Sequence, residues 1–210
     1  MRLRLKDPFS GLSHLVGFAL AIVGLAWLAR HGTSDDVGPG VAIYGASLIA
    51  LYAASSAHHL VVGGARTTRA LRVLDHVAIF LLIAGTCTPV LCRALDGAAR
   101  TAMLAWVWGA AFVGIALRLL WRRTPRALYT SLYVAMGWMI LVRWQDVQRG
   151  IPPAALGLIV AGGVIYTLGA LVYALRRPNP LPRVFGFHEI WHLFVLGGSA
   201  LHFAAVASLR

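Results

Sequence analysis

Five residues that can bind a metal ion or transfer a proton stand at corresponding ends of three apolar segments. They are Ser55 and His59 at the end of the second segment, Asp75 at the start of the third, and His188 and His192 at the start of the seventh. Consecutive membrane-spanning helices alternate in direction, so these ends lie at one face of a bilayer. Ionisable side chains at membrane depth are costly and usually face a bundle interior or a wet cavity. We therefore expect the five side chains to converge.

The spacing of the histidines favours a metal site. His188 and His192 are four residues apart, which places them on one face of a helix where both can bind one ion. Ser55 stands one helical turn before the third histidine, His59. A catalytic zinc takes three protein ligands and keeps a fourth position for water, so we predict zinc bound by His59, His188 and His192. Asp75 then either orients that water or accepts a hydrogen bond from the second ring nitrogen of a ligand.

The composition indicates a membrane protein. Hydrophobic residues make up 59% of the 210 residues and charged residues 12%, which is typical of a chain embedded in lipid. Seven apolar runs are long enough, or nearly so, to cross about 30 Å of hydrocarbon. They cover residues 12–29, 41–62, 74–91, 102–117, 127–142, 153–175 and 184–209. The sequence therefore predicts an all-α integral membrane protein, a seven-transmembrane-helix bundle with a single domain over residues 1–210.

The basic residues are distributed unevenly between the loops. A formal net charge of +12 would suggest nucleic-acid binding in a soluble protein. Here the charges lie between apolar runs and set the orientation in the membrane, so we expect no nucleic-acid partner. On the side of the amino terminus lie 13 of the 19 Lys and Arg residues, which predicts a cytoplasmic amino terminus, an external carboxyl terminus and a metal site near the cytoplasmic face. No small-residue cleavage site follows the first apolar run, so we expect no cleavable signal peptide.

Other polar and aromatic residues have structural interpretations. His14 stands at the depth of the predicted site. His58 and His76 point about 100° away from their neighbours at 59 and 75, which favours polar packing, and His202 is a lone histidine in the other half of the last segment. The aromatic residues predicted to anchor the segment ends at the membrane interface are Trp121, Tyr129 and Trp144.

Three motifs resemble a known family. The segment Ser55-Ser56-Ala57-His58-His59 is similar to the S-x3-H motif of the bacterial haemolysin III proteins. These belong with the adiponectin receptors in the progestin and adipoQ receptor family. Leu74-Asp75-His76 and the Leu82–Pro89 run resemble the next motif, and Phe187–His192 resembles the final one. Because the motifs occur in the family's order, the resemblance covers essentially the whole chain.

The resemblance implies a fold, a cofactor and an activity. It implies seven helices with a cytoplasmic amino terminus in a bacterial inner membrane. It also implies that His59, His188 and His192 bind zinc and that Asp75 holds a zinc-bound water. Adiponectin receptors are credited with ceramide hydrolysis, and the bacterial branch is named for haemolytic activity and tied to membrane-lipid homeostasis.

The function that we favour is zinc-assisted hydrolysis of a lipid amide or ester near the inner leaflet, and the resemblance implies that this lipid is ceramide-like. Asp75 would accept the proton of the attacking water as a general base. Ser55 would steady the reacting oxygen or hydrogen-bond the substrate, while a fatty acyl chain lies between helices. One alternative is a sensor or receptor in which zinc joins three helices and Asp75 closes the site as a fourth ligand. Another is a pore-forming haemolysin, but polar residues gather on the inner side only, which favours a site over a pore.

A protease is the remaining alternative. His188-Glu189-Ile190-Trp191-His192 matches the H-E-x-x-H signature, in which the glutamate is the general base. Leu95-Asp96-Gly97 imitates the LDG of intramembrane proteases, but there the LDG follows the H-E-x-x-H, and here it precedes it. Asp96 is also predicted on the other side of the bilayer from His188, which disfavours the protease.

Overall fold

The protein is described by a computed structural model, which covers residues 6–31, 37–121, 124–182 and 184–209. In chain order its helices are α1 (Pro8–Arg30), α2 (Gly38–Leu60), α3 (Ala65–Ala94), α4 (Gly97–Leu120), α5 (Arg126–Gly137), the 3₁₀ helix η1 (Met139–Arg143), α6 (Trp144–Gly150), α7 (Pro153–Leu175) and α8 (Phe187–Ala207). The described residues form no strand beyond an isolated bridge between Leu181 and Phe185. The all-helical prediction is confirmed.

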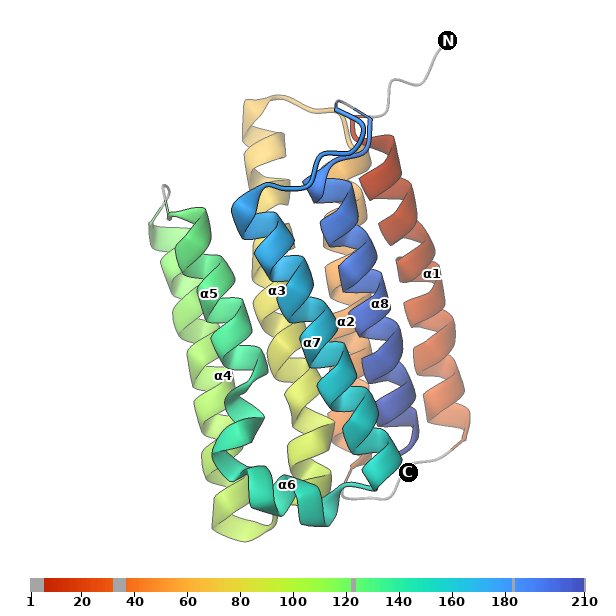
Figure 1. Cartoon of the computed structure of the whole chain (residues 1–210), viewed down its shortest axis with the longest axis vertical. Coiled ribbons are helices and arrows are strands. Elements are labelled where there is room, and N and C mark those ends of the chain that lie inside the picture. Colours follow the sequence, from red (N-terminus) through yellow and green to blue (C-terminus); the bar gives the residue numbers. More distant parts are fainter. Residues whose placement is uncertain (1–5, 32–36, 122–123, 183, 210) are drawn as a thin grey trace.

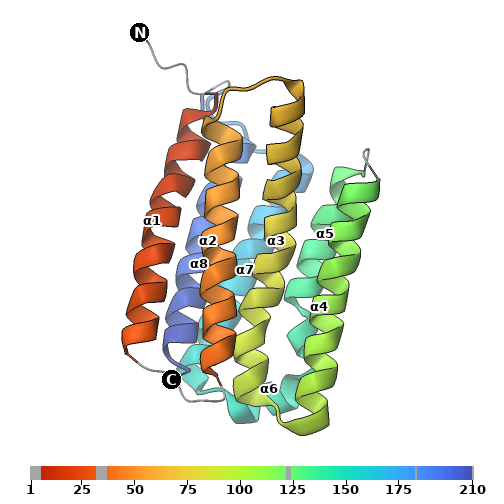
Figure 2. The same ribbon diagram turned by 180° about the vertical axis from the view of Figure 1, so that it is seen from behind.

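Seven helices run along the bundle and α6 crosses one end (Figure 1). Seen from behind, α1, α2, α3 and α4 stand side by side in chain order (Figure 2). Helices α5, α7 and α8 complete the bundle, and α8 packs back against α1. One end of the bundle, which we call the site end, is where α1, α3, α5 and α8 begin and where α2, α4 and α7 finish. The amino and carboxyl termini lie at opposite ends (Figure 1).

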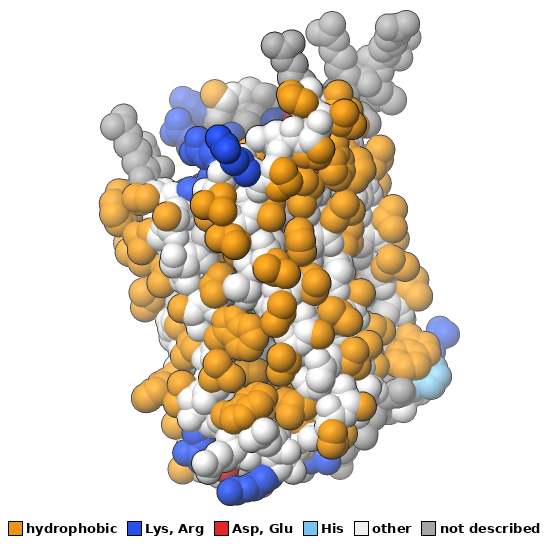
Figure 3. Space-filling model, viewed as in Figure 1, with side chains coloured by type: hydrophobic (Ala, Val, Ile, Leu, Met, Phe, Trp, Pro, Cys, Tyr) orange, Lys and Arg blue, Asp and Glu red, His pale blue; other side chains and the backbone are white. Residues whose placement is uncertain are grey.

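The outer surface fits a lipid environment. Among the described residues, six helices (α1, α2, α3, α4, α7 and α8) are long and apolar enough to cross a membrane, whereas α5 has only 12 residues. Apolar side chains that would be unfavourable in water, such as Val23 at 65% exposure and Leu20 at 63%, lie on this surface. In the space-filling view they form a broad band, with Lys and Arg gathered beyond it at either end (Figure 3). The bundle is therefore that of an integral membrane protein.

Two helices differ from the expected ranges. The apolar run at 74–91 marks only the middle of α3, which extends from Ala65 to Ala94, because residues such as Arg66 and Arg69 suit a helix even where they do not suit hydrocarbon. The run expected as one helix over 127–142 is broken, since α5 ends at Gly137 and η1 follows. Apolarity locates the part of a helix that contacts lipid, but not its ends.

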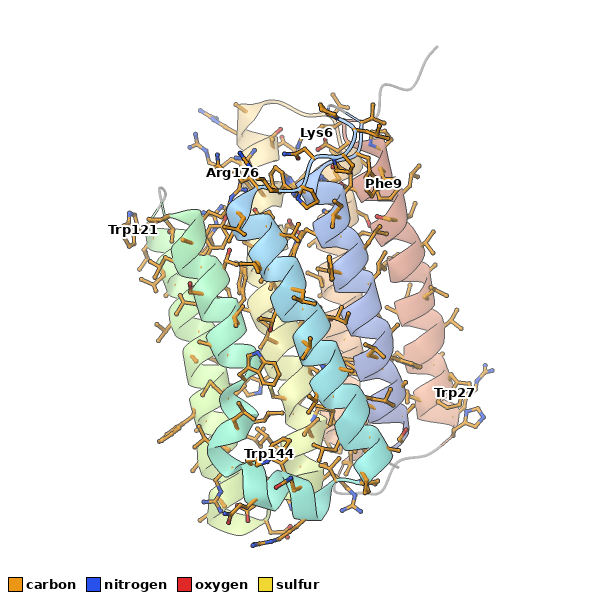
Figure 4. The ribbon with its side chains drawn as sticks, viewed as in Figure 1. Lys6, Phe9, Trp27, Trp121, Trp144 and Arg176 are labelled. Carbon is orange, nitrogen blue, oxygen red and sulfur yellow. The ribbon has the colours of Figure 1, made fainter. Side chains whose placement is uncertain are left out.

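The aromatic anchors divide into two kinds. Trp121 lies at the site end and Trp144 near the opposite end (Figure 4), and Trp121 is 48% exposed. Tyr129 differs from its predicted anchoring role, because it is buried and its hydroxyl lies 3.3 Å from the hydroxyl of Tyr173. Its position in the sequence is near a helix end, but the first turn of α5 faces the bundle interior there.

Six basic residues used in the charge count lie outside the described residues. These are Arg2, Arg4, Arg122, Arg123, Arg183 and Arg210. The orientation of the bundle in the membrane therefore stays a prediction, whereas the placement of the termini at opposite ends agrees with an odd number of crossings.

Candidate metal centre

Three histidines from two helices meet at the site end. His59 comes from the last turn of α2, and His188 and His192 come from the first two turns of α8. The Nε2 atom of His188 lies 3.3 Å from Nε2 of His59 and 3.2 Å from Nε2 of His192. The ligand atoms of all three lie within 4.8 Å of one another. The four-residue spacing in α8 and the opposite direction of α2 produce this convergence, as the sequence predicts.

The histidine geometry fits a shared ion better than hydrogen bonds. One ring nitrogen offers a single proton or a single lone pair, so Nε2 of His188 cannot make two full hydrogen bonds to its two neighbours. Nitrogens bound at 2.0–2.1 Å to one tetrahedral ion stand about 3.3 Å apart, which matches the 3.2 and 3.3 Å separations. The three side chains therefore fit a metal ion, and an imidazole donor set suits zinc among others.

Asp7 is a member of the site that the sequence analysis missed. Its Oδ2 atom lies 3.1 Å from Nδ1 of His59, the arrangement in which a carboxylate fixes the ring of a metal-binding histidine. The backbone supports this contact, because the Asp7 N–H donates to the His59 carbonyl at 3.0 Å. Gly11 lets α1 approach, since a Cβ there would overlap Leu60 and lie 3.3 Å from His59 Cβ. The sequence signal that could have identified Asp7 is its position directly before the first helix, on the same side of the membrane as the predicted site.

Asp75 and Ser55 lie beside the three histidines without joining their group. A carboxylate oxygen of Asp75 lies within 4.8 Å of ligand atoms of His58 and His59, and Ser55 lines the same chamber as this carboxylate. The sequence leaves two roles open for Asp75, which are to orient the water or to accept a hydrogen bond from a histidine ring. Asp7, and not Asp75, faces the second ring nitrogen of His59.

The neighbouring histidines pack around the site. His14 is buried, its ring centroid lies 3.9 Å from that of His192, and neither of its ring nitrogens has a hydrogen-bond partner among the described residues. His76 accepts a hydrogen bond at Nδ1 from Nε of Arg118 at 2.8 Å. His202 stands far along α8 and its Nε2 lies 3.1 Å from the Ile159 carbonyl oxygen. His76 and His202 have the polar packing roles that their positions favour.

Glu189 has a structural role that weakens the protease alternative. Its Oε2 atom accepts a hydrogen bond from the backbone N–H of Gly186 at 2.8 Å, which satisfies the N-cap N–H at the start of α8. The carboxylate therefore caps its own helix. Asp96 precedes α4 at the opposite end of the bundle, so the H-E-x-x-H and LDG sequences do not meet.

A chamber of about 490 Å³ opens beside the histidines. Its lining includes His59, His188 and His192 together with Ser55 and Asp75, so the chamber connects the candidate ligands with the carboxylate. A narrow apolar cavity of about 100 Å³ continues from it toward the opposite end. The residues that line both are Leu51, Ile79, Tyr133, Trp191 and Val195.

The arrangement of motifs and fold agrees with the comparison to known families. The model of the family described as haemolysin-III related matches residues 3–203. The chain belongs to this family. The resemblance drawn from the three motifs is thereby confirmed, and the chain is a multi-pass membrane protein.

Curated relatives extend from bacteria to animals. The chain is 35% identical to "Hemolysin-3" of Bacillus cereus over 205 residues, covering 96% of this chain and 90% of the relative. It is 32% identical to "Hemolysin-3 homolog" of Bacillus subtilis (strain 168), covering 96% and 92%. It is also 28% identical to "Monocyte to macrophage differentiation factor" of Homo sapiens, covering 89% and 76%. Sequence similarity over most of the chain therefore extends from bacterial relatives to a human one.

Proposed function

We propose that the protein is a zinc-dependent hydrolase that cleaves the amide bond of a ceramide-like membrane lipid and serves membrane-lipid homeostasis. The observation that carries the proposal is the convergence of His59, His188 and His192 beside a chamber that also holds Asp75, a carboxylate outside the three-histidine group. An open three-histidine site with an adjacent base is the arrangement of catalytic rather than structural zinc.

Each side chain at the site has a separate task. His59, His188 and His192 would hold zinc, which when bound polarises a carbonyl and activates water. The contact of Asp7 with Nδ1 of His59 fixes the orientation of that ring. Asp75 accepts the proton of the attacking water and returns it to the leaving nitrogen, as a positioned general base and acid.

Ser55 and the apolar cavity position the substrate. Ser55 and Asp75 line the same chamber, so the Ser55 hydroxyl would orient the Asp75 carboxylate or bind the substrate. The apolar cavity continues from the chamber between α3, α5, α7 and α8, where a fatty acyl chain would be sheltered from water. The amide would thus lie at the histidines while its chain extends into the bundle.

We place the site near the cytoplasmic face of a bacterial inner membrane. The support is the excess of Lys and Arg on the amino-terminal side of the chain and the bacterial origin of the most similar curated relatives reported above. In that orientation a lipid of the inner leaflet can reach the chamber laterally.

A zinc-stabilised sensor is the second candidate. Asp75 lies within 4.8 Å of ligand atoms of His58 and His59, so a modest movement would make it a fourth ligand and close the site. A pore-forming haemolysin, which the names of the bacterial relatives suggest, has less support. Among the described residues the polar chamber lies at the site end, and the cavity that continues from it is apolar.

Fatty-acid release from long-chain ceramide, acyl amides and phospholipids tests the proposal with protein purified in detergent. Release should require zinc, stop with a chelator and return when zinc is added back. Asp75→Asn should lower the rate by about a hundredfold or more while keeping the metal, and Asp96→Asn at the opposite end should leave both unchanged.

Two results would move the assignment to the sensor. One is the absence of metal-dependent release from the whole lipid panel. The other is complete metal loss in Asp75→Asn with the fold intact, because Asp75 would then be a ligand of a closed site.

A further inference from the structure

The chamber beside the histidines carries more positive charge than the proposed chemistry uses. Four basic side chains line it, one from the segment before α1 and one each from α3, α4 and α5. They are Lys6, Arg72, Arg118 and Arg126. Lys6 lies at the site end (Figure 4).

These four cations have no carboxylate partner in the part of the chain that the structure describes. Lys6 donates to the His58 carbonyl oxygen at 3.2 Å, and Arg118 donates to His76. The guanidinium of Arg126 lies over the ring of Tyr173 at 4.5 Å. Each of these groups is neutral, so the contacts hold the cations in place without balancing their charge.

The carboxylates of the chamber are already engaged. Asp7 contacts His59, and Asp75 lies beside Ser55. Four cations against two carboxylates leave an excess of positive charge, and zinc at the histidines would add to it. Like charges gathered in a partly enclosed space repel one another and favour the entry of an anion.

The chemistry of the cations points to phosphate. Arginine presents a planar set of N–H donors that matches phosphate oxygens, often with two parallel hydrogen bonds. The chamber has room for more than an ion, because about 490 Å³ lies within the range of roughly 300–1,000 Å³ that is typical of small-molecule sites. The site end also lies where a bundle in a bilayer meets the lipid headgroups.

We propose that Lys6, Arg72, Arg118 and Arg126 bind the phosphate of a lipid headgroup while the acyl linkage of the same lipid lies at the histidines. The inference rests on the proposed hydrolase and narrows its substrate class to ceramide-like lipid amides whose headgroup carries a phosphate. Lipid phosphate and free inorganic phosphate share this chemistry, and the experiment must separate them.

Binding of a lipid that cannot be hydrolysed tests the inference independently of turnover. The probe is a short-chain dialkyl ether analogue of phosphatidic acid, and the matching neutral probe is the dialkyl glycerol without phosphate. Affinities are measured on the full-length, zinc-loaded protein in neutral detergent. The phosphate probe should bind more tightly than the neutral one, and Arg72→Gln/Arg126→Gln should weaken only the phosphate probe, by roughly tenfold or more.

A matched double variant controls for net charge. Arg66→Gln/Arg69→Gln removes the same charge from the same end, but these residues line a separate surface depression, so phosphate binding should be kept. Arg126→Lys should retain part of the affinity if charge is what matters. Equal binding of the two probes, or equal loss in the control variant, would overturn the inference.

Inorganic phosphate provides the last arm. Weak competition by it at high concentration agrees with a lipid site, whereas binding of inorganic phosphate as tight as that of the lipid would overturn the headgroup assignment. Because the probe lacks an acyl bond, failure of hydrolysis leaves this result unaffected. Hydrolysis of neutral ceramide without phosphate binding would retain the enzyme and reject only the headgroup site.

Discussion

The two ends of the bundle use their charged residues differently. At the opposite end the described carboxylates pair with nearby arginines, Asp96 with Arg100 at 2.7 Å and Asp146 with Arg143 at 2.7 Å. At the site end no described carboxylate pairs with a Lys or Arg. Asp7 contacts His59, Asp75 lies beside Ser55, and Glu189 caps α8.

The charged residues of the opposite end stabilise local turns near helix ends, whereas those of the site end form the candidate site. Exposed pairs three or four residues apart hold a local turn and contribute little to stability. The groups of the site end come from segments far apart in the chain, as with Asp7 and His59, 52 residues apart. Such contacts form only when separate helices have packed together, whereas a helix end is completed by its own neighbouring residues.

Reporter fusions test which end of the bundle faces the cytoplasm. Each reporter should be either fully active or inactive, so the expected effect is the largest. We expect a reporter that is active only outside the cytoplasm to work when fused after Arg210, because most basic residues lie on the amino-terminal side. Fusions placed between α2 and α3 should be inactive. If a reporter that fluoresces only in the cytoplasm were active at Arg210, the orientation would be reversed and the site would lie at the outer face.

Metal content should distinguish the histidines of the two ends of α8. Purified protein should carry about one zinc per chain, and His188→Ala or His192→Ala should weaken binding by more than about a hundredfold, because loss of a ligand exceeds the loss of its supporting contact. His202→Ala removes a buried histidine of the same helix and should keep the zinc. If elemental analysis found one zinc per chain in both His188→Ala and His192→Ala, these two histidines would be excluded as ligands.

The Asp7 contact should have a smaller but measurable effect. Asp7→Asn removes the charge beside Nδ1 of His59 and should lower zinc affinity by about 10- to 100-fold, measured by competition with a chelator. Asp96→Asn, the same change at the opposite end, is the control. Equal affinities in the two variants would mean that Asp7 only joins α1 to α2.

The paired charges of the opposite end should matter least. Asp146→Asn removes the partner of Arg143, and both side chains are partly exposed. We expect the free energy of unfolding to change by about 1 kcal/mol or less, with zinc content unaltered. A thermal unfolding curve in detergent gives the first quantity, and a zinc loss in this variant would show that the two ends are coupled.

The sequence could predict the convergence of the three histidines because the depth of a residue in the bundle follows from the order of the helices. His59 ends one helix and His188 and His192 begin another, so alternation of direction suffices to bring them together. The apolar runs similarly located the lipid-facing parts of the helices. The helix ends were not accessible in this way, because Arg66 and Arg69 continue α3 beyond the hydrocarbon.

Contacts that depend on lateral packing were not predictable. The sequence does not show that the residue before α1 meets the last turn of α2, which depends on the close approach at Gly11. The same holds for Arg118 and Arg126. Their position between apolar runs indicates only orientation in the membrane, whereas the packing of α4 and α5 turns them into the chamber.

The contact between Asp7 and His59 has a practical consequence for anyone who purifies this protein. In the proposed zinc site the His59 ring would both contact Asp7 and bind the ion, so the two events would be thermodynamically linked, and each should strengthen the other to the same extent. An affinity tag at the amino terminus that pulls this segment from the bundle should yield metal-poor preparations. A tag after Arg210 should not, because α8 ends at the end of the bundle opposite the site. The choice of tag should therefore decide whether the proposed zinc is still bound when hydrolysis is assayed.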